Sequence, residues 1–121
     1  MISAKENNFI FFKLGKNETV DDFLEALQTY GIKSGFLYGF GKLNTIETGN
    51  RILEVEEVIL QGVISNLKGK PHLELYCFSN QTQKIKNFVS QELIIIVNEF
   101  RKIKLISILD EQGNFNLNIS D

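Results

Sequence analysis

QGVISNLKGKPHLELYCF, residues 61–78, is the most informative segment of this chain. It predicts two antiparallel strands joined by a two-residue turn at Lys68-Gly69, because glycine readily adopts the positive φ that such turns require. Pro71 falls near the start of the second strand, where a missing N–H is tolerated. The stretch is therefore interpreted as a β-hairpin.

The two strands of this hairpin each have one apolar face. Side chains alternate between the faces of a strand, so each strand divides into two sets. In the first strand the apolar or small set is Val58, Leu60, Gly62 and Ile64, opposite Ile59, Gln61, Val63 and Ser65. In the second strand the apolar set is Leu73, Leu75 and Cys77, opposite His72, Glu74, Tyr76 and Phe78. The apolar sets are predicted to face the core, and the imidazole, carboxylate and phenol are predicted to share the face where a site would be built.

Three segments together resemble the plant and prokaryote conserved (PPC) domain. They are GVIS at 62–65 followed by GKP at 69–71, YGFGKL at 38–43, and TVDDFLEAL at 19–27, which is similar to the first helix of that family. The resemblance covers roughly residues 8–110. It implies a single α+β domain over residues 1–121, mainly an antiparallel sheet with one principal helix packed on it, assembled as a trimer. Such domains occur alone in prokaryotes and behind AT-hook segments in plant nuclear proteins.

Prokaryotic members of that family typically read G-K-P-x-x-H-x-H in this strand, with a third histidine downstream, a set that resembles a metal site. Here the two positions hold Glu74 and Tyr76, and Asn87 is the best counterpart of the third, while His72 lies two residues early. Tyrosine and asparagine are poor zinc ligands. We therefore expect no metal and no cofactor, with His72 and Glu74 as weak metal candidates, and all four residues as candidates for a small-ligand pocket.

The glycine-rich run 35–41, GFLYGFG, superficially suggests a phosphate loop. Such loops open a helix whose N-terminus binds the anion, and no helix pattern begins after Gly41. Glycines inside a strand more often mark bulges or close backbone approach. Gly39 and Gly41 are accordingly predicted to lie in a strand, where their bare backbone is also a candidate for binding a carboxylate.

One principal helix is predicted from Thr19 to about Tyr30. Thr19 is a credible N-cap with Asp22 three residues on, and Gly31 suits the position that ends a helix. Strands are expected at 9–14, 34–42, 46–49, 56–65, 72–80, 93–101 and 104–109, with a weak final strand in the tail and a short turn or helix at 83–88. The chain thus reads as one α+β unit.

The run LIIIV at 93–97 is apolar at every position. Ile94 and Ile96 point one way, and Leu93, Ile95 and Val97 the other. A strand with two apolar faces must be covered on both sides, and one helix covers only one face of a sheet. We therefore expect these five residues to mark a homotrimer interface; the alternative is that loops or a second short helix cover the remaining side.

Composition limits the classes of function. The formal net charge is −2, which gives no basic footprint for nucleic acid, and the single cysteine excludes an internal disulfide. The N-terminal segment is too polar and short for a signal peptide, and no apolar run approaches a membrane span. A cytoplasmic protein without membrane attachment is expected.

Arg101, Lys102 and Lys104 form the densest basic cluster, which is balanced by nearby acidic residues and more often marks a solvated strand end than a DNA surface. Nucleophilic catalysis needs a base beside the nucleophile, and Cys77 is predicted to be buried and inert. We expect a non-enzymatic, homotrimeric scaffold for protein interaction. The alternatives are a DNA-binding or transcription-associated protein, and a small-ligand or metal-binding protein with a degraded histidine site.

Overall fold

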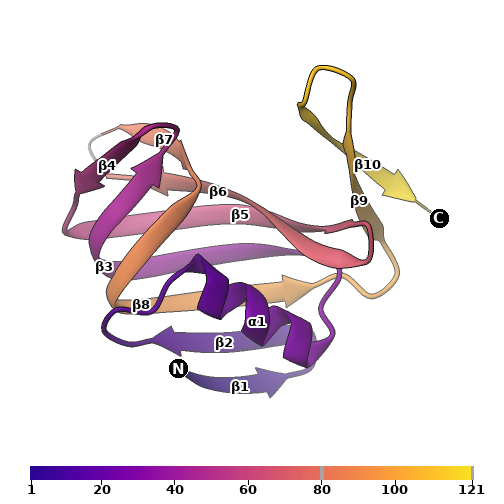
Figure 1. Ribbon diagram of the computed structural model, residues 1–121. Helices are drawn as coiled ribbons and strands as arrows, with labels where there is room; N and C mark the ends of the chain where they lie inside the picture. Colours follow the sequence, from indigo (N-terminus) through magenta and orange to yellow (C-terminus); the bar gives the residue numbers. More distant parts are fainter. Residues whose placement is uncertain (80, 121) are drawn as a thin grey trace.

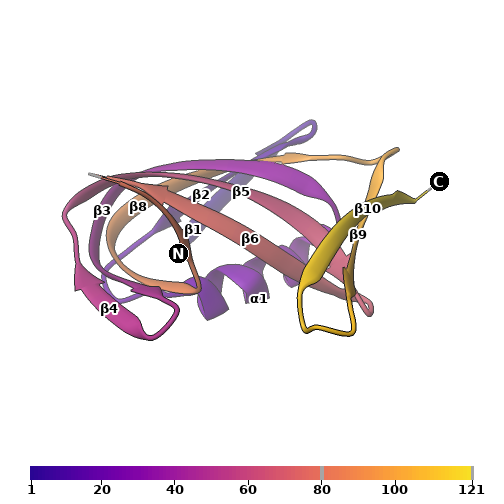
Figure 2. The ribbon, with the colours of Figure 1, turned by 90° about the horizontal axis from the view of Figure 1, so that it is seen from above.

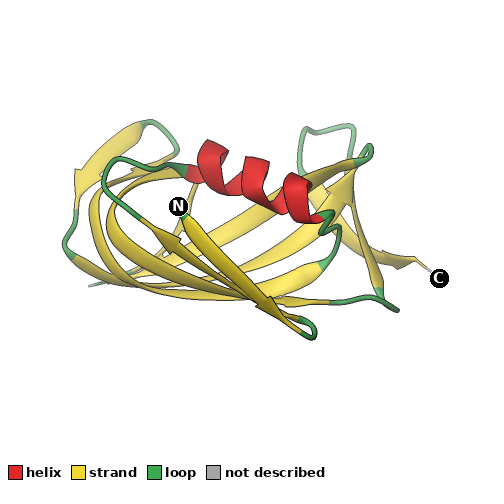
Figure 3. Cartoon of the chain, turned by 90° about the horizontal axis from the view of Figure 1, so that it is seen from below, coloured by secondary structure: helices red, strands yellow, loops and turns green. Residues whose placement is uncertain are grey.

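The computed structural model describes residues 1–79 and 81–120. They form one strongly curved sheet, and a single helix lies across its inner, concave face (Figures 1 and 3). The elements in chain order are β1 (Ile2–Glu6), β2 (Phe9–Leu14), α1 (Val20–Tyr30), β3 (Gly35–Thr48), β4 (Arg51–Glu54), β5 (Glu57–Leu67), β6 (Lys70–Phe78), β7 (Thr82–Ile85), β8 (Asn87–Glu99), β9 (Lys104–Leu109) and β10 (Phe115–Ser120). The predicted α+β class is confirmed.

The sheet has the strand order β1-β2-β8-β3-β5-β6-β7, and every neighbouring pair in this path is antiparallel. The late strand β8 lies between the early strands β2 and β3, so residues far apart in sequence meet at the centre of the sheet. Short β4 pairs with β3, and the β9–β10 hairpin is attached to β5 by a parallel bridge between Asn66 and Ile106.

The β5–β6 hairpin predicted from residues 61–78 is confirmed. Lys68 and Gly69 have φ values of 51° and 86°, and the ladder closes with Leu67 opposite Lys70. The Asn66 Oδ1 atom accepts a 2.7 Å hydrogen bond from the Gly69 N–H and holds the turn. The predicted inner residues of both strands are buried, apart from half-buried Leu73: Val58, Leu60, Gly62, Ile64, Leu75 and Cys77.

Helix α1 begins and ends where its sequence predicts. The Thr19 N–H donates to Asp22 Oδ2 at 2.8 Å, and Gly31 adopts the left-handed conformation with φ of 70°. Phe23 packs edge-to-face on Phe12 of β2, with ring centroids 5.2 Å apart. This contact and the buried stripe of the helix bind α1 to the inner face of the sheet, where the core lies. In the described part of the chain, no helix is both long and apolar enough to cross a membrane.

Other predicted boundaries were wrong. The strands expected at 34–42 and 46–49 are one strand, β3, because a register shift against β8 around Leu43 lets the chain continue through an irregular point. Residues 83–88, expected as a turn or helix, cover the end of β7, a bend at Lys86 and the start of β8. Strands β1 and β4 were not predicted, since their mostly exposed side chains show no buried alternation and only pairing with β2 and β3 defines them. The predicted strand end at residue 80 lies outside the described residues.

The β9–β10 hairpin, hereafter the arm, projects from one end of the sheet (Figures 1 and 2). It touches the sheet through Ser107, whose Oγ is 2.6 Å from Ser65 Oγ, and through Phe115, whose ring centroid is 4.4 Å from that of His72. Several large apolar side chains of the arm remain exposed: Ile108, Leu109, Phe115, Leu117 and Ile119. The arm is therefore anchored at the base of β9 and presents apolar surface outward along the rest of its length.

The Ser65–Ser107 hydrogen bond should matter for stability because both side chains are buried. Replacing Ser107 by alanine leaves the Ser65 hydroxyl without its partner, which should lower the free energy of unfolding by about 1–3 kcal/mol. The double variant Ser65→Ala/Ser107→Ala removes both hydroxyls and should be less destabilised than Ser107→Ala alone. Urea unfolding, with exposed Ser79→Ala as the control, measures this; additive losses in the double variant would contradict it.

Candidate functional site

The structure brings His72 and Glu74 together. Both side chains lie at the start of β6 and line an open cavity of about 380 Å³, with Lys84 on β7 and Phe115 on the arm among its other walls. Strand β7 pairs only with the second half of β6. This leaves the first half of β6 as a free edge beside the cavity.

The other candidates for this pocket lie elsewhere. Tyr76 follows on the same face of β6 but is exposed and outside the cavity lining. Asn87 contacts the N-terminus of α1 instead, because its Oδ1 atom accepts a 3.2 Å hydrogen bond from the Val20 N–H. Gly39 is buried under β8, where a Cβ would stand 3.2 Å from the Ile94 carbonyl oxygen. Gly41 lines a separate cavity between β3 and β5. The six predicted residues therefore do not form a single pocket.

The donor set around His72 fits a metal poorly. Among the described residues, no group of three or more histidine, cysteine, aspartate or glutamate side chains could hold a metal ion. His72 and Glu74 supply two donors, whereas zinc is held in proteins by three or four. Cys77 is buried on the opposite face of β6, and this burial raises the pKa of its thiol.

The surroundings of His72 lower the pKa of its imidazole and so favour the neutral form. Desolvation by burial lowers its pKa, Glu74 acts in the opposite direction with a smaller effect, and Lys84 lowers the pKa further. Phe115 covers one side of the ring at 4.4 Å. The contact between these two rings packs the arm against the sheet at the edge of the cavity.

This lowered pKa predicts a pH dependence of stability. In the unfolded chain the imidazole of His72 takes up a proton at about pH 6.5. In the folded chain it does so only at a lower pH, so the free energy of unfolding decreases as the pH falls below about 6.5. The loss should be small, since His72 is half-exposed. We expect the difference in unfolding free energy between pH 7 and pH 5 to be smaller in His72→Gln than in the unchanged protein. Identical pH dependence in the two proteins would refute this role of His72.

The convex side of the sheet, hereafter the outer face, carries an array of mostly apolar side chains. Its seven most exposed large side chains are 37–48% exposed: Phe9, Phe11, Phe36, Tyr38, Phe40, Ile59 and Tyr76. The strand register places them in neighbouring rows. One row runs from Phe11 through Ile96 and Tyr38 to Gln61 and Tyr76, and the next from Ile94 through Phe40 to Ile59 and Phe78.

The run 93–97 contributes to both faces in the predicted alternation. Leu93, Ile95 and Val97 are fully buried in the chain's own core, whereas Ile94 and Ile96 are half-buried on the outer face. The aromatic part of the outer face was missed in the sequence. The sequence does contain a signal for it, because aromatic residues recur at every second position, at Phe9 and Phe11 on β2 and at Phe36, Tyr38 and Phe40 on β3. They alternate with the buried residues of the same strands.

No protein-family model matches the chain, and no curated protein sequence matches it. Solved structures do resemble it. A candidate DNA-binding protein from Ralstonia eutropha JMP134 superposes with a TM-score of 0.82 at 14% identity, over 98% of this chain and 96% of that one. A candidate DNA-binding protein from Bacteroides thetaiotaomicron gives a TM-score of 0.81 at 16% identity, over 97% and 96%. A plant- and prokaryote-conserved (PPC) protein from Pyrococcus horikoshii gives 0.75 at 12% identity, over 97% and 94%.

The chain has the PPC fold. The superpositions extend over nearly the whole of each chain, so the likeness includes the sheet, α1 and the arm rather than one motif. This confirms the resemblance carried by residues 19–27, 38–43 and 62–71. At these identities the likeness establishes the PPC fold alone.

Proposed function

We propose that this PPC-fold protein acts in the cytoplasm as a homotrimeric, non-enzymatic module for protein interaction, and that subunits cover one another's outer faces. The observation that carries the proposal is the apolar array on the outer face. Helix α1 covers the inner face only, and the outer face stays uncovered in the single described chain (Figure 3).

The size and composition of the outer face support association. Soluble monomers rarely expose large contiguous apolar patches, whereas interfaces are enriched in aromatic side chains. Burying a large apolar side chain fully stabilises by about 1.5–3 kcal/mol. Several such side chains per subunit can offset the entropic cost of association.

The arm supports a closed ring of subunits. Its exposed apolar residues, such as Leu117 and Ile119, differ in position from the outer face, so one subunit offers two distinct surfaces. A contact between unlike surfaces is heterologous, and repeated with closure it forms a ring. Three is the number of subunits that the PPC resemblance implies.

The mass of the protein in solution tests this proposal. Light scattering coupled to size exclusion should give three times the chain mass of 13.8 kDa at micromolar concentration. A particle of 13.8 kDa would overturn the proposal, because the outer face would then be stable in water without a partner.

Direct DNA binding is the second candidate function. Two structures with this fold are described as candidate DNA-binding proteins, and a group of basic side chains gathers beside the β8–β9 connection. The net charge of −2 argues against a broad phosphate-binding surface. A mobility shift of a short DNA duplex that weakens steeply with salt would favour this candidate.

A further inference from the structure

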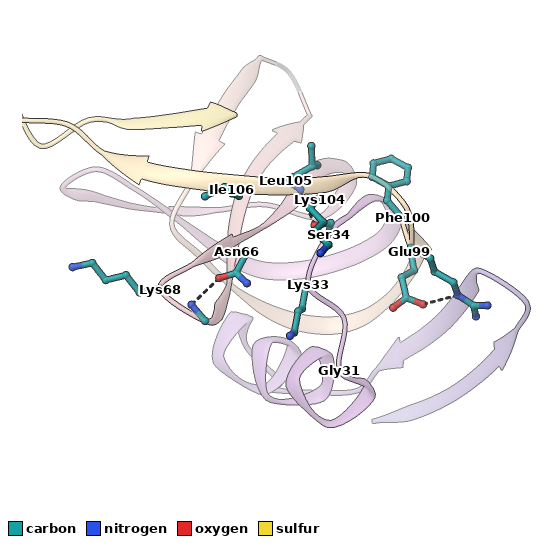
Figure 4. A pocket seen from close by; sticks show the side chains of 12 residues that line it. Gly31, Lys33, Ser34, Asn66, Lys68, Glu99, Phe100, Lys104, Leu105 and Ile106 are labelled. Atoms are coloured by element: carbon teal, nitrogen blue, oxygen red, sulfur yellow. Dashed lines mark hydrogen bonds and ion pairs between the residues drawn. The ribbon is translucent and has the colours of Figure 1, made fainter. Parts of the chain in front are cut away.

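A cationic cavity lies at the end of the sheet where three chain connections meet. Its volume is about 520 Å³, within the range of small-molecule sites. The walls come from the segment after α1 (Gly31 to Ser34), the β5–β6 turn (Asn66 to Gly69) and the chain from Glu99 to Ile106. Figure 4 shows these segments reaching the cavity from different sides, with Lys33 near the helix end, Asn66 at the end of β5, and Phe100 on the β8–β9 connection.

The charges around this cavity are unbalanced. Four basic side chains line it, Lys33, Lys68, Arg101 and Lys104, against one carboxylate, Glu99. In a chain with 15 acidic and 13 basic residues, such a local excess of positive charge is not a consequence of composition. Positive charges gathered around a cavity attract anions and raise their local concentration there.

The one carboxylate does not neutralise the cavity. Glu99 Oε1 lies 3.5 Å from Lys5 Nζ on β1 and 3.5 Å from Arg101 Nε. Arg101 also donates from Nη2 to the Asn7 carbonyl oxygen at 3.0 Å, which fixes its side chain. Among residues 1–79 and 81–120, no carboxylate lies within 4.0 Å of the amines of Lys33, Lys68 or Lys104.

Neutral donors lie among these cations. Ser34 is buried, and its Oγ accepts the Leu105 N–H at 2.9 Å, which leaves the hydroxyl proton free to donate. Asn66 accepts the Gly69 N–H through Oδ1, so its amide NH₂ group keeps its donors. The apolar walls come from Phe100, Leu105 and Ile106. The cavity therefore offers donors and positive charge beside an apolar wall.

From this arrangement we propose that the cavity binds a small organic anion, with its phosphate or carboxylate group held by Lys33, Lys104 and the Ser34 hydroxyl, and an apolar or planar part against Phe100. This site lies on the helix side at one end of the sheet, apart from the outer face, and the proposal goes beyond the trimeric module. A concave cavity of this volume suits a small molecule better than a duplex, whose backbone is tracked by an extended basic surface. Lys68 extends outward from its turn (Figure 4) and adds positive charge at the rim.

Calorimetric titration with pyrophosphate, citrate and 5′-AMP at low ionic strength tests the site. We expect at least one of these anions to bind at sub-millimolar concentration, and Lys33→Gln/Lys104→Gln to weaken it at least about tenfold. The matched control is Lys16→Gln/Lys42→Gln, which removes the same charge from exposed positions outside the cavity and should change affinity less than about twofold. Light scattering on each variant checks that assembly is unchanged.

Phe100→Ala separates the apolar wall from the charges. The substitution should weaken the binding of 5′-AMP more than that of pyrophosphate, since only the nucleotide has a planar group that can pack against the Phe100 ring. An equal loss of affinity for both anions would show that Phe100 does not contact the planar part of the ligand.

Three results would overturn the proposal. One is the absence of millimolar or tighter binding by all three anions. Another is equal loss of affinity in the cavity variant and the control variant, which would show general electrostatic attraction. The third is tight binding of a short DNA duplex, lost in the cavity variant while the small anions bind weakly, which would assign these lysines to nucleic acid.

Discussion

If the proposed trimer forms through the outer face, replacing Tyr38 by glutamate should convert it into folded monomers. Tyr38 lies at the centre of the outer face, with Ile96 on β8 and Gln61 on β5 as its cross-strand neighbours. A carboxylate buried there without a partner costs several kcal/mol in each subunit. Because Tyr38 is exposed in the single chain, the substitution leaves the core of the subunit unchanged. Light scattering should then report the 13.8-kDa chain mass, with a circular dichroism spectrum like that of the unchanged protein.

The matched control for this experiment is Gln28→Glu. Gln28 is exposed on α1, on the opposite side of the sheet, so a new carboxylate there should leave the proposed trimer intact. A trimer that survives Tyr38→Glu would show that the outer face is not the contact between subunits. Dissociation by both variants would point to net charge rather than to the outer face.

Gly41→Ala should be the most damaging single substitution for stability. Gly41 has a φ of +148°, which side chains rarely adopt, and an added Cβ would overlap the Glu92 carbonyl oxygen and stand 2.9 Å from Leu93 Cα. These atoms are backbone atoms of the neighbouring strand β8, which cannot move without opening the ladder. Backbone strain and overlap together should lower the free energy of unfolding by at least about 3 kcal/mol, as urea or thermal unfolding would show.

Gly49→Ala separates the two causes of this loss. Gly49 also has a positive φ, of 51°, but nothing lies within 4 Å of its added Cβ. It should therefore show the conformational cost alone, about 1–2 kcal/mol. If Gly41→Ala were no worse than Gly49→Ala, the close approach of β3 and β8 at this point would not be rigid.

Several parts of the fold could be predicted because their signals are local. Gly69 indicated the turn and its own positive φ, and Thr19, Asp22 and Gly31 marked the ends of α1. The interpretation of the glycines in β3 was also right, since Gly39 and Gly41 allow close approach of neighbouring backbone. Each feature depends on a few adjacent residues, so neighbouring sequence is sufficient to indicate it.

The candidate sites were predicted less well because they depend on strand order. Alternation predicted that His72 and Glu74 lie on one face of β6, and both line the same cavity, but it could not show that Asn87 would accept a hydrogen bond from the first turn of α1 instead of joining them. The basic cluster was interpreted from residues 101–104 alone. Lys33 and Asn66, which complete its cavity, lie more than 30 residues away on other connections.

Residues close together in the chain are enough to specify the hairpin, the capped helix, the inner faces of the central strands and the two-sided character of residues 93–97, because period-two alternation and turn chemistry act within one element. The tertiary structure places β8 between β2 and β3, which lines up the aromatic side chains of separate strands into one outer face. It also brought the three connections together at one end of the sheet, around the cationic cavity. Long-range strand pairing decides these neighbours, and local sequence does not specify which strands pair.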